Sequence, residues 1–158
     1  MRFPVRAAFL LLALVPALLL AACGSGDADG VERITVSVAG LTIDAEVACT
    51  PEQRGLGLGF REAIGHGEGM LFVYDDANLA SFWMRGMQFP LDFIWIDAER
   101  TVVDLTLDVP PPEPGTADED LPRYVPAAPV RYVLEVNAGV VREGSVAIGD
   151  AVTFDPEP

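Results

Sequence analysis

Two charged residues near the middle of the chain, Arg85 and Asp92, are the first candidates for chemistry. They flank a loop between two apolar stretches, and Asp92 falls on the strand face that Ile94 and Ile96 share. A lone carboxylate is costly to bury, and an arginine can bind it through two parallel hydrogen bonds. We therefore expect an Arg85–Asp92 ion pair. We favour a structural role that pins the loop, and the functional alternative is a cleft in which the pair orients a polar ligand.

Two further arginines, Arg54 and Arg61, lie in and just after a segment with the signature of a short helix. In an acidic chain, two neighbouring guanidinium groups can bind a carboxylate or a phosphate. Local acids could neutralise them instead. Glu135 and Asn137 share one face of a later predicted strand, and that face meets either solvent or the short helix. We favour the second arrangement, in which they bind Arg54 or Arg61 as a structural network.

Aromatic residues offer a stacking surface for a sugar or another ring. Trp83 is the best candidate because it adjoins Arg85 and a glycine-containing loop, whereas Trp95 and Tyr74 lie in apolar strand patterns typical of a core. A site for a small ligand is expected to be a concave pocket. The residues predicted to line it are Trp83, Met84, Arg85 and Asp92.

The sequence contains no pattern of a metal or cofactor site. His66 is the only histidine, and no set of His, Cys and carboxylate residues has ligand spacing. The glycines at 55, 57 and 59 lack the spacing of a dinucleotide loop. We expect no metal and no cofactor. Catalysis is the weaker alternative, since an enzyme would need converging acid–base groups, for which Asp92 with Glu135 or His66 is the best combination.

Alternating and apolar runs predict a mainly β fold. Residues 33–38 and 41–47 alternate around an Ala39-Gly40 turn, which indicates a hairpin, and Thr50 to Gln53 has the form of a helix capping box. Further strands are expected at 70–74, which 75–78 should interrupt, and at 81–85, 91–96, 101–109, 130–136 and 151–154, with a short helix near 139–143. We predict one β-sandwich or flattened barrel of short, mostly antiparallel strands with one or two short helices.

The N-terminal residues have the layout of an export signal. Arg2 and Arg6 precede an uncharged run over 7–22, which is short for a span of roughly 20 apolar residues. Leu20-Ala21-Ala22-Cys23 resembles the lipobox of bacterial lipoproteins, which implies cleavage before Cys23 and lipid on its thiol. We expect a signal peptide at 1–22, the lipidated Cys23 with a flexible tether at 23–30, a β domain at 31–156, and within it an exposed Pro- and acid-rich loop at 110–122.

The net charge and the predicted lipid anchor together limit the partners that we expect for this protein. The chain has a net charge of −14, and loss of the two arginines in the signal peptide would bring it to −16. Such a chain cannot neutralise phosphates, so we expect no nucleic-acid partner. We expect an exported protein held by lipid on the cell membrane or outer membrane, with its domain extracytoplasmic, on the periplasmic side in a two-membrane bacterium. Its other partner would be a small polar envelope ligand or an envelope protein.

Several stretches together resemble the domain of unknown function 192 family of bacteria and archaea. They are Thr50 to Arg61 (T-x-x-x-R-x-x-G-L-x-F-R), Gly69 to Val73, Phe82-Trp83-Met84-Arg85, Pro90 to Asp97, Leu134 to Gly139, and Gly149-Asp150. The resemblance covers roughly residues 31 to 156. It implies a compact, mainly β domain, often exported, with no established reaction. Gly59, Gly86 and Met87 stand where the family usually has Met, Asn and Thr, so a site that used that Asn-Thr pair would be lost here.

Overall fold

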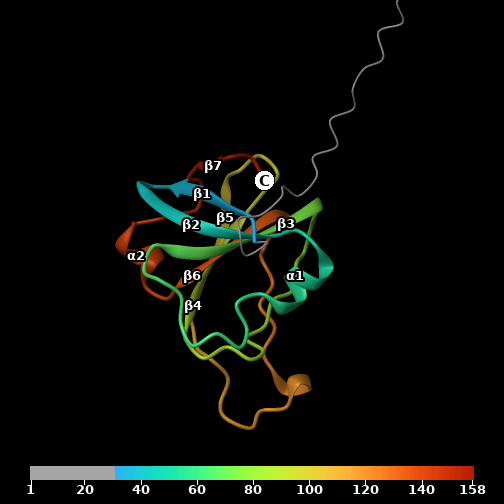
Figure 1. Ribbon diagram of the computed structural model, residues 1–158. Helices are drawn as coiled ribbons and strands as arrows, with labels where there is room; N and C mark the ends of the chain where they lie inside the picture. The colour runs from blue at the N-terminus through green and yellow to red at the C-terminus, as the bar shows by residue number, and fades with distance from the viewer. Residues whose placement is uncertain (1–30) are drawn as a thin grey trace, which may run out of the picture.

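The computed structural model of the protein describes residues 31–158 (Figure 1). The predicted signal peptide, Cys23 and the tether lie outside the described residues. Among residues 31–158, no helix is both long and apolar enough to cross a membrane. The strands are β1 (Arg33–Val38), β2 (Leu41–Ala48), β3 (Glu68–Asn78), β4 (Leu91–Ile96), β5 (Val102–Val109), β6 (Val130–Asn137) and β7 (Val152–Asp155). The helical elements are α1 (Pro51–Leu56), the 3-10 turn η1 (Asp118–Asp120) and α2 (Val140–Glu143).

The seven strands form one curled sheet in the order β5-β4-β6-β3-β2-β1-β7 (Figure 1). Neighbours are antiparallel except β2 and β3, which run parallel and are connected through α1. A bridge between Thr101 and Ala151 joins the residues just before β5 to those just before β7. The backbone N–H of Val102 also donates to the carbonyl of Asp150 at 2.9 Å. Within the described residues, the two edges of the sheet therefore touch only where β5 and β7 begin, and the predicted mainly β fold is confirmed in the form of a half-barrel.

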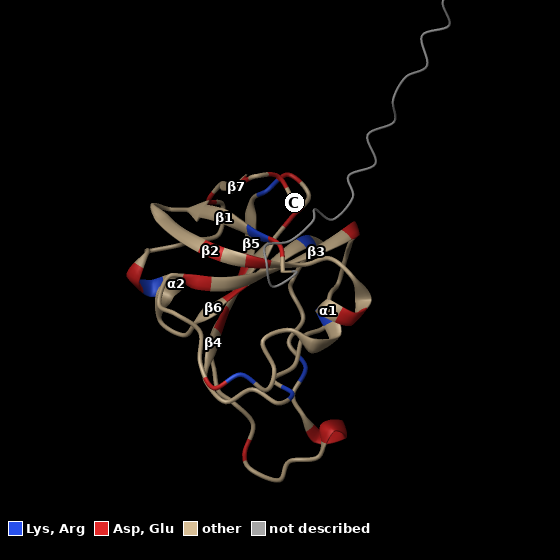
Figure 2. Ribbon diagram, in the orientation of Figure 1, with Lys and Arg blue, Asp and Glu red and all other residues tan. Residues whose placement is uncertain are grey.

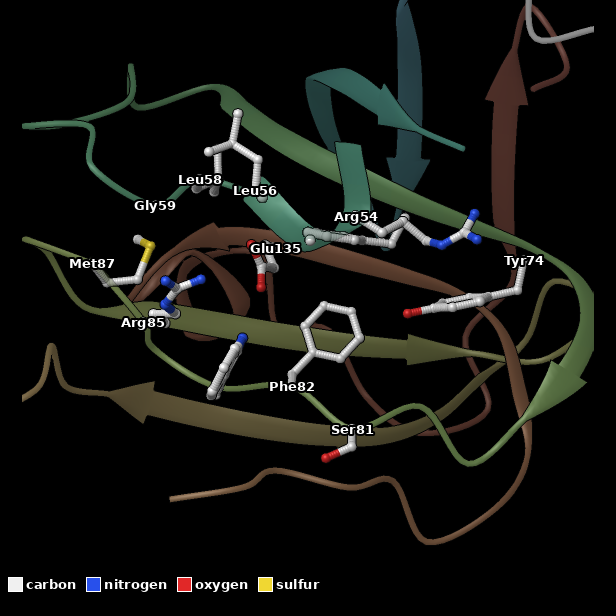
Figure 3. A pocket seen from close by; sticks show the side chains of 14 residues that line it. Arg54, Leu56, Leu58, Gly59, Tyr74, Ser81, Phe82, Arg85, Met87 and Glu135 are labelled. Carbon is white, nitrogen blue, oxygen red and sulfur yellow. The ribbon is translucent and has the colours of Figure 1, made fainter. Parts of the chain in front are cut away.

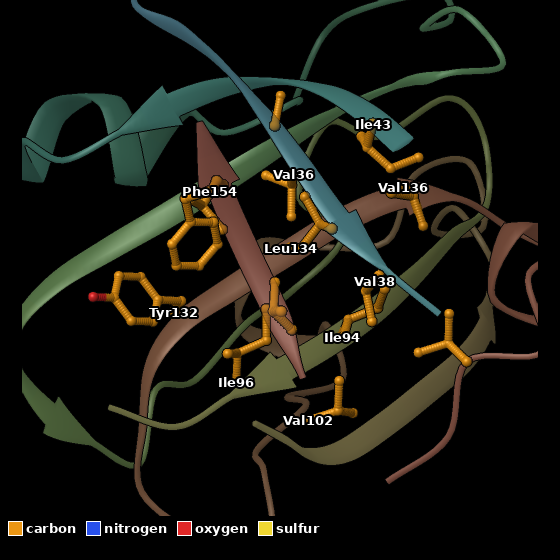
Figure 4. Packing of buried hydrophobic residues seen from close by; sticks show 14 of the residues in the cluster. Val36, Val38, Ile43, Ile94, Ile96, Val102, Tyr132, Leu134, Val136 and Phe154 are labelled. Carbon is orange, nitrogen blue, oxygen red and sulfur yellow. The ribbon is translucent and has the colours of Figure 1, made fainter. Parts of the chain in front are cut away.

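The inner face of the curled sheet holds the larger apolar core (Figure 4). Alternate residues of the β1–β2 hairpin supply Val36, Val38 and Ile43, and Leu134 and Ile94 come from β6 and β4. All five are 2% exposed or less. Burying one such side chain is worth about 1.5–3 kcal/mol. This face therefore fixes the register of the sheet, and the site described below lies on the opposite face.

A second apolar cluster covers the outer face of β3, β4 and β6. Phe82, from the segment between β3 and β4, packs edge-on against Trp95 of β4 with ring centroids 5.4 Å apart. Its backbone pairs with Tyr124, from the long β5–β6 connection, through an isolated bridge. Strand β4 is consequently buried on both faces over its whole length, which explains its continuous apolar sequence. Two long connections, rather than a second sheet, form this outer layer.

Local sequence patterns account for α1, α2 and the β1–β2 hairpin. The Thr50 side chain accepts from the Gln53 N–H at 3.2 Å, and the Gln53 side chain accepts from the Thr50 N–H at 3.0 Å. This confirms the predicted capping box. The hairpin is confirmed too, with Val36 opposite Ile43. The predicted helix near 139–143 is present as α2.

Two strand boundaries differ from the prediction. The predicted interruption at 75–78 is wrong, because β3 continues to Asn78 across exposed residues where its pairing with β6 shifts register. The predicted strand at 81–85 is also wrong, apart from the bridge at Phe82. Phe82 and Met84 bury their side chains in the outer core, so this apolar run covers the sheet instead of joining it. The loop at 110–122 is mostly exposed as expected, but it contains η1 and buries Leu121.

Candidate functional site

A hollow of about 70 Å³ opens on the outer face of the sheet, between α1, the segment 81–87 and the strands β3 and β6 (Figure 3). Aromatic rings and glycine backbone form much of its wall. Three lining residues belong to charged types, namely Arg54, Arg85 and Glu135. The other lining residues are Gly55, Leu56, Gly57, Leu58, Gly59, Phe72, Tyr74, Ser81, Phe82, Trp83 and Met87.

Glu135 provides the buried acid of the hollow. It lies in β6 between Phe93 of β4 and Met70 of β3, and it is only 4% exposed. No described residue hydrogen-bonds or pairs with its carboxyl group. Burial raises the pKa of Glu135 to about 8, because the charged form loses its water and gains no partner. The carboxyl group is therefore mainly protonated at neutral pH and can donate a hydrogen bond into the hollow.

Arg54 fastens α1 to the sheet at one side of the hollow. Its Nη1 donates to the carbonyl of Val73 at 2.9 Å and to the carbonyl of Cys49. Its guanidinium lies over the Tyr74 ring, 4.9 Å from the ring centroid. Figure 3 shows the Arg54 head group turned away from Glu135 and toward Tyr74. Arg54 therefore forms part of the wall, and its hydrogen bonds hold the helix in place.

Arg85 lies at the other side of the hollow. Its Nε pairs with Asp118 of η1 at 2.7 Å, and its guanidinium lies 5.6 Å from the centre of the Trp83 ring. Arg123 contacts the same ring at 3.7 Å, so two arginines hold Trp83. No described residue hydrogen-bonds to the two terminal amino groups of Arg85. The Arg85 side chain is 46% exposed, which leaves these groups open to a ligand.

The predicted Arg85–Asp92 pair is wrong. Asp92 faces the inner side of the sheet and is fully buried, whereas Arg85 lies on the outer side. The Asp92 carboxylate accepts from the backbone N–H groups of Asp108 at 2.8 Å, Gly139 at 2.9 Å and Val141 at 3.2 Å. These donors satisfy the buried charge without an arginine. Asp92 therefore joins β4, β5 and the start of α2, and it takes no part in the hollow.

The predicted pairing of Glu135 and Asn137 with the two arginines is wrong as well. Arg61 instead makes a bidentate pair with Glu46 of β2, at 2.7 and 2.8 Å. This hydrogen bonding lowers the pKa of Glu46 against the opposing effect of its burial. Asn137 donates to the carbonyls of Ile64 and Gly65 at 3.2 and 3.1 Å. Both residues hold the loop after α1 against the sheet.

The remaining predicted residues divide between core and surface. Met84 is 3% exposed in the outer core and does not line the hollow. The His66 side chain is 82% exposed and contacts Glu143 at 3.1 Å, away from Glu135. The catalytic combinations of Asp92 with Glu135 or His66 are therefore not assembled. Trp83, Arg54, Arg85 and Glu135 are the predicted residues that the structure brings together.

Two contributors were not predicted from the sequence. Tyr74 was assigned to the core but lines the hollow, where the Arg54 guanidinium of α1 lies over its ring. Burial also raises the pKa of Tyr74. The alternate glycines 55, 57 and 59 form part of the wall. Their spacing in the sequence was the available signal, since a run of glycines after a capped helix leaves backbone accessible to a ligand.

Comparisons with known proteins place the chain among uncharacterised β domains. A family model described as "Uncharacterized ACR", the domain of unknown function 192, matches residues 34–154. A solved protein of unknown function from Novosphingobium aromaticivorans is 30% identical, with a TM-score of 0.69 over 85% of this chain and 94% of that one. A solved protein from Sinorhizobium meliloti, described as a candidate transcription regulator, is 28% identical, with a TM-score of 0.67 over 78% of this chain and 92% of that one. No curated protein matches. The chain belongs to the domain of unknown function 192 family.

Proposed function

We propose that the protein is a membrane-anchored extracytoplasmic module that binds a small polar ligand in the hollow at Glu135. The observation that carries this proposal is the carboxyl group of Glu135, which is buried, faces the hollow and has no partner among the described residues. A buried polar group without a hydrogen bond costs about 1–3 kcal/mol. A ligand that hydrogen-bonds to Glu135 would recover part of this cost.

The walls suit a ligand with a polar tip. Phe82 and Trp83 supply apolar and stacking surface, and Arg85 supplies hydrogen-bond donors at one side. At about 70 Å³ the hollow holds the end of a molecule, not a whole drug-sized ligand. The rest of the ligand would lie against the rim. Recognition of one polar group is therefore the function that this geometry supports best.

Binding is favoured over catalysis because Glu135 supplies the only carboxyl group among the lining residues of the hollow. Among the described residues, Tyr74 is the only other acid that lines the hollow, and it is a weak one. Asp92 lies on the opposite face of the sheet with its oxygens occupied by backbone N–H groups. General acid–base catalysis needs groups within hydrogen-bond reach of the reacting atoms. A single protonated carboxyl supplies a donor for recognition.

A thermal-shift screen of the whole chain in non-ionic detergent tests the proposal with envelope sugars, carboxylates and amines. A ligand at about a hundred times its dissociation constant adds roughly 2.7 kcal/mol of stability. We expect stabilisation by one chemical class, and loss of that effect in Glu135→Ala but not in the control His66→Ala. A flat response across the panel, or equal stabilisation of Glu135→Ala, would contradict small-ligand binding.

The anchor is the second part of the proposal, and it rests on the resemblance of Leu20 to Cys23 to a lipobox. Two or more acyl chains hold a protein firmly on a bilayer, whereas one chain does so only marginally. Mass analysis of the cell-derived chain should show cleavage before Cys23 and an acylated N-terminal residue. The chain has two cysteines, Cys23 and Cys49, so a non-reduced mass that shows a disulfide between them would exclude acylation of that thiol.

An accessory module that binds an envelope protein is the alternative, and one observation favours it. Leu56 and Phe60 are 60% and 65% exposed, and Leu56 lines the hollow. Large apolar side chains gathered at a rim are typical of protein interfaces. Under this alternative Leu56→Ser and Phe60→Ser would weaken capture of an envelope partner, whereas Glu135→Ala would leave capture unchanged.

A further inference from the structure

We infer that the ligand of the hollow carries a small oxyanion, and that Arg85 binds this group in exchange for Asp118. The inference rests on the proposed function and deepens it, since it names the chemical class of the ligand. Two features carry it: the unused donors of Arg85, and the acidic side chain that already occupies its Nε.

Arg85 has the geometry of a ligand-binding arginine. The Trp83 ring lies beside its guanidinium, and its two terminal amino groups lack hydrogen-bond partners among the described residues. A guanidinium presents its donors in a planar fork that matches the two oxygens of a carboxylate or phosphate. Figure 3 shows the Arg85 side chain reaching into the hollow beside Glu135. An oxyanion there would find donors that are already oriented.

Asp118 marks the position that an anion prefers. Its Oδ2 lies 2.7 Å from the Arg85 Nε, and both side chains are about half exposed, at 54% and 46%. An exposed ion pair of this kind is worth only about 0–1 kcal/mol. Asp118 belongs to the three-residue acidic turn η1, which is red in Figure 2, within the long β5–β6 connection. Exchange of Asp118 for a ligand oxyanion is therefore inexpensive, and the acid acts as an internal competitor.

The chemistry of the hollow favours an anion over a cation. Arg54 and Arg85 both line it, so an ammonium group would meet two positive charges. Glu135 lacks an ion-pair partner in the described residues and is mainly protonated at neutral pH, because its burial raises its pKa to about 8. A protonated carboxyl donates a hydrogen bond to an oxygen of the ligand and adds no repulsion.

The overall charge of −14 opposes an anionic ligand only at long range. At physiological ionic strength the Debye length is about 8 Å, so acids on distant surfaces are largely screened. Arg85 would contact the bound group directly, and a hydrogen bond to a charged group contributes about 1.5–3 kcal/mol. Direct contact therefore decides affinity, and the net charge mainly slows association.

Calorimetric titration of the whole chain in non-ionic detergent tests the inference. The probes are acetate, inorganic phosphate, glycerol and methylammonium, at constant ionic strength in an oxyanion-free buffer. We expect acetate or phosphate to bind, and Arg85→Gln to abolish that binding. Asp118→Asn should tighten it up to about five-fold, which corresponds to losing a competitor worth about 1 kcal/mol. Glu119→Gln removes the same charge from η1 without freeing Arg85, so it should leave the affinity within two-fold of the parent, as expected for about 0.4 kcal/mol or less.

The outcomes separate this inference from the function on which it rests. Binding of glycerol or methylammonium that Glu135→Ala abolishes would overturn the oxyanion class while leaving a ligand site at Glu135. Equal effects of Asp118→Asn and Glu119→Gln would show that general charge, not competition at Arg85, sets the affinity, and would overturn the exchange. Absence of binding by all four probes, together with a flat thermal-shift screen, would overturn both.

Discussion

Glu135 lies directly opposite Met70 across the β3–β6 pair, and its carboxyl group therefore stands in an otherwise apolar row of the outer face. On the other side its neighbour in β4 is Phe93, which is fully buried. Two apolar strand neighbours thus restrict the access of water to the acid, and no hydrogen bond joins either side chain to it. This placement, not a neighbouring charge, sets the titration of Glu135.

The first prediction is that Glu135→Gln stabilises the protein in alkali and has little effect in acid. The ordinary pKa of a glutamate is 4.5, and burial raises that of Glu135 to about 8. Between these values the folded state binds more protons than the unfolded state, so the contribution of Glu135 to stability falls as pH rises from 4.5 through 8. Glutamine keeps the shape and cannot ionise. The variant should exceed the parent by about 3–5 kcal/mol near pH 9.

Urea unfolding at several pH values measures this difference. The two proteins should be similarly stable near pH 4.5, where the parent carboxyl is neutral in the folded state and half ionised in the unfolded state, a difference of only about 0.4 kcal/mol. Glu119→Gln is the control, since its side chain is exposed on η1 and should give a curve parallel to that of the parent. A difference between Glu135→Gln and the parent that stays constant from pH 5 to 9 would contradict the burial of an unpaired acid.

The second prediction concerns Glu46, which should show the opposite pH dependence. Hydrogen bonding by Arg61 lowers its pKa below the usual 4.5, and the charge of Arg33 acts in the same direction. Its contribution is therefore fully present above pH 4.5 and is lost as pH falls through the lowered value. Glu46→Gln should cost about 2 kcal/mol at pH 7. Urea unfolding should show this cost shrinking in acid, and a cost that grows as pH falls would contradict the pairing.

The sequence patterns predicted the faces of the strands better than the partners of the side chains. Asp92 was assigned to the face of Ile94 and Ile96, and the structure places it there with Ile94 in the inner core. That assignment already separated Asp92 from Arg85, whose segment packs on the outer face. The Arg85–Asp92 pair was predicted because the two side chains carry opposite charges. In the structure, three backbone N–H groups donate to the Asp92 carboxylate instead. Backbone donors have no signature in a sequence.

The hollow could be predicted only in part because it depends on how two long connections cover the outer face. Glu135 was placed on the correct face of its strand, whereas the segment of Trp83 and Arg85 was wrongly predicted to be a strand. What brings them together is the bridge between Phe82 and Tyr124, which joins residues far apart in the chain. Neither residue lies in a regular strand, so alternation could not indicate the contact. The capping box and the hairpin, by contrast, are local and were predicted fully.

The third prediction is that Asp92→Asn destabilises the fold and leaves the hollow unchanged. The carboxylate accepts three backbone hydrogen bonds, from Asp108, Gly139 and Val141. An asparagine keeps one oxygen and turns an amino group toward an N–H donor, so at least one buried donor loses its acceptor. We expect a loss of about 2–4 kcal/mol in urea unfolding. The folded fraction of the variant should bind oxyanions with the affinity of the parent. A loss of affinity in this folded fraction would show that Asp92 contributes to the binding site.

The fourth prediction tests why this chain has glycine at position 86, where the family pattern has asparagine. Gly86 has a φ of +69°, which asparagine tolerates better than most residues. A Cβ there would lie 2.7 Å from Cε1 of the Phe60 ring, however. Because Phe60 is 65% exposed, its ring can turn aside. We therefore expect Gly86→Asn to cost only about 1–2 kcal/mol.

A double-mutant cycle with Phe60→Ala assigns that cost to the ring. If Phe60 is the obstacle, Gly86→Asn should cost at least about 1 kcal/mol less in the Phe60→Ala background, because contacting residues couple by about 0.5–3 kcal/mol. Gly115→Asn is the matched control: Gly115 also has a positive φ, of +86°, but no atom lies within 4 Å of the added Cβ. Equal costs at positions 86 and 115 in unfolding titrations would show that backbone conformation alone, not Phe60, selects glycine beside the hollow.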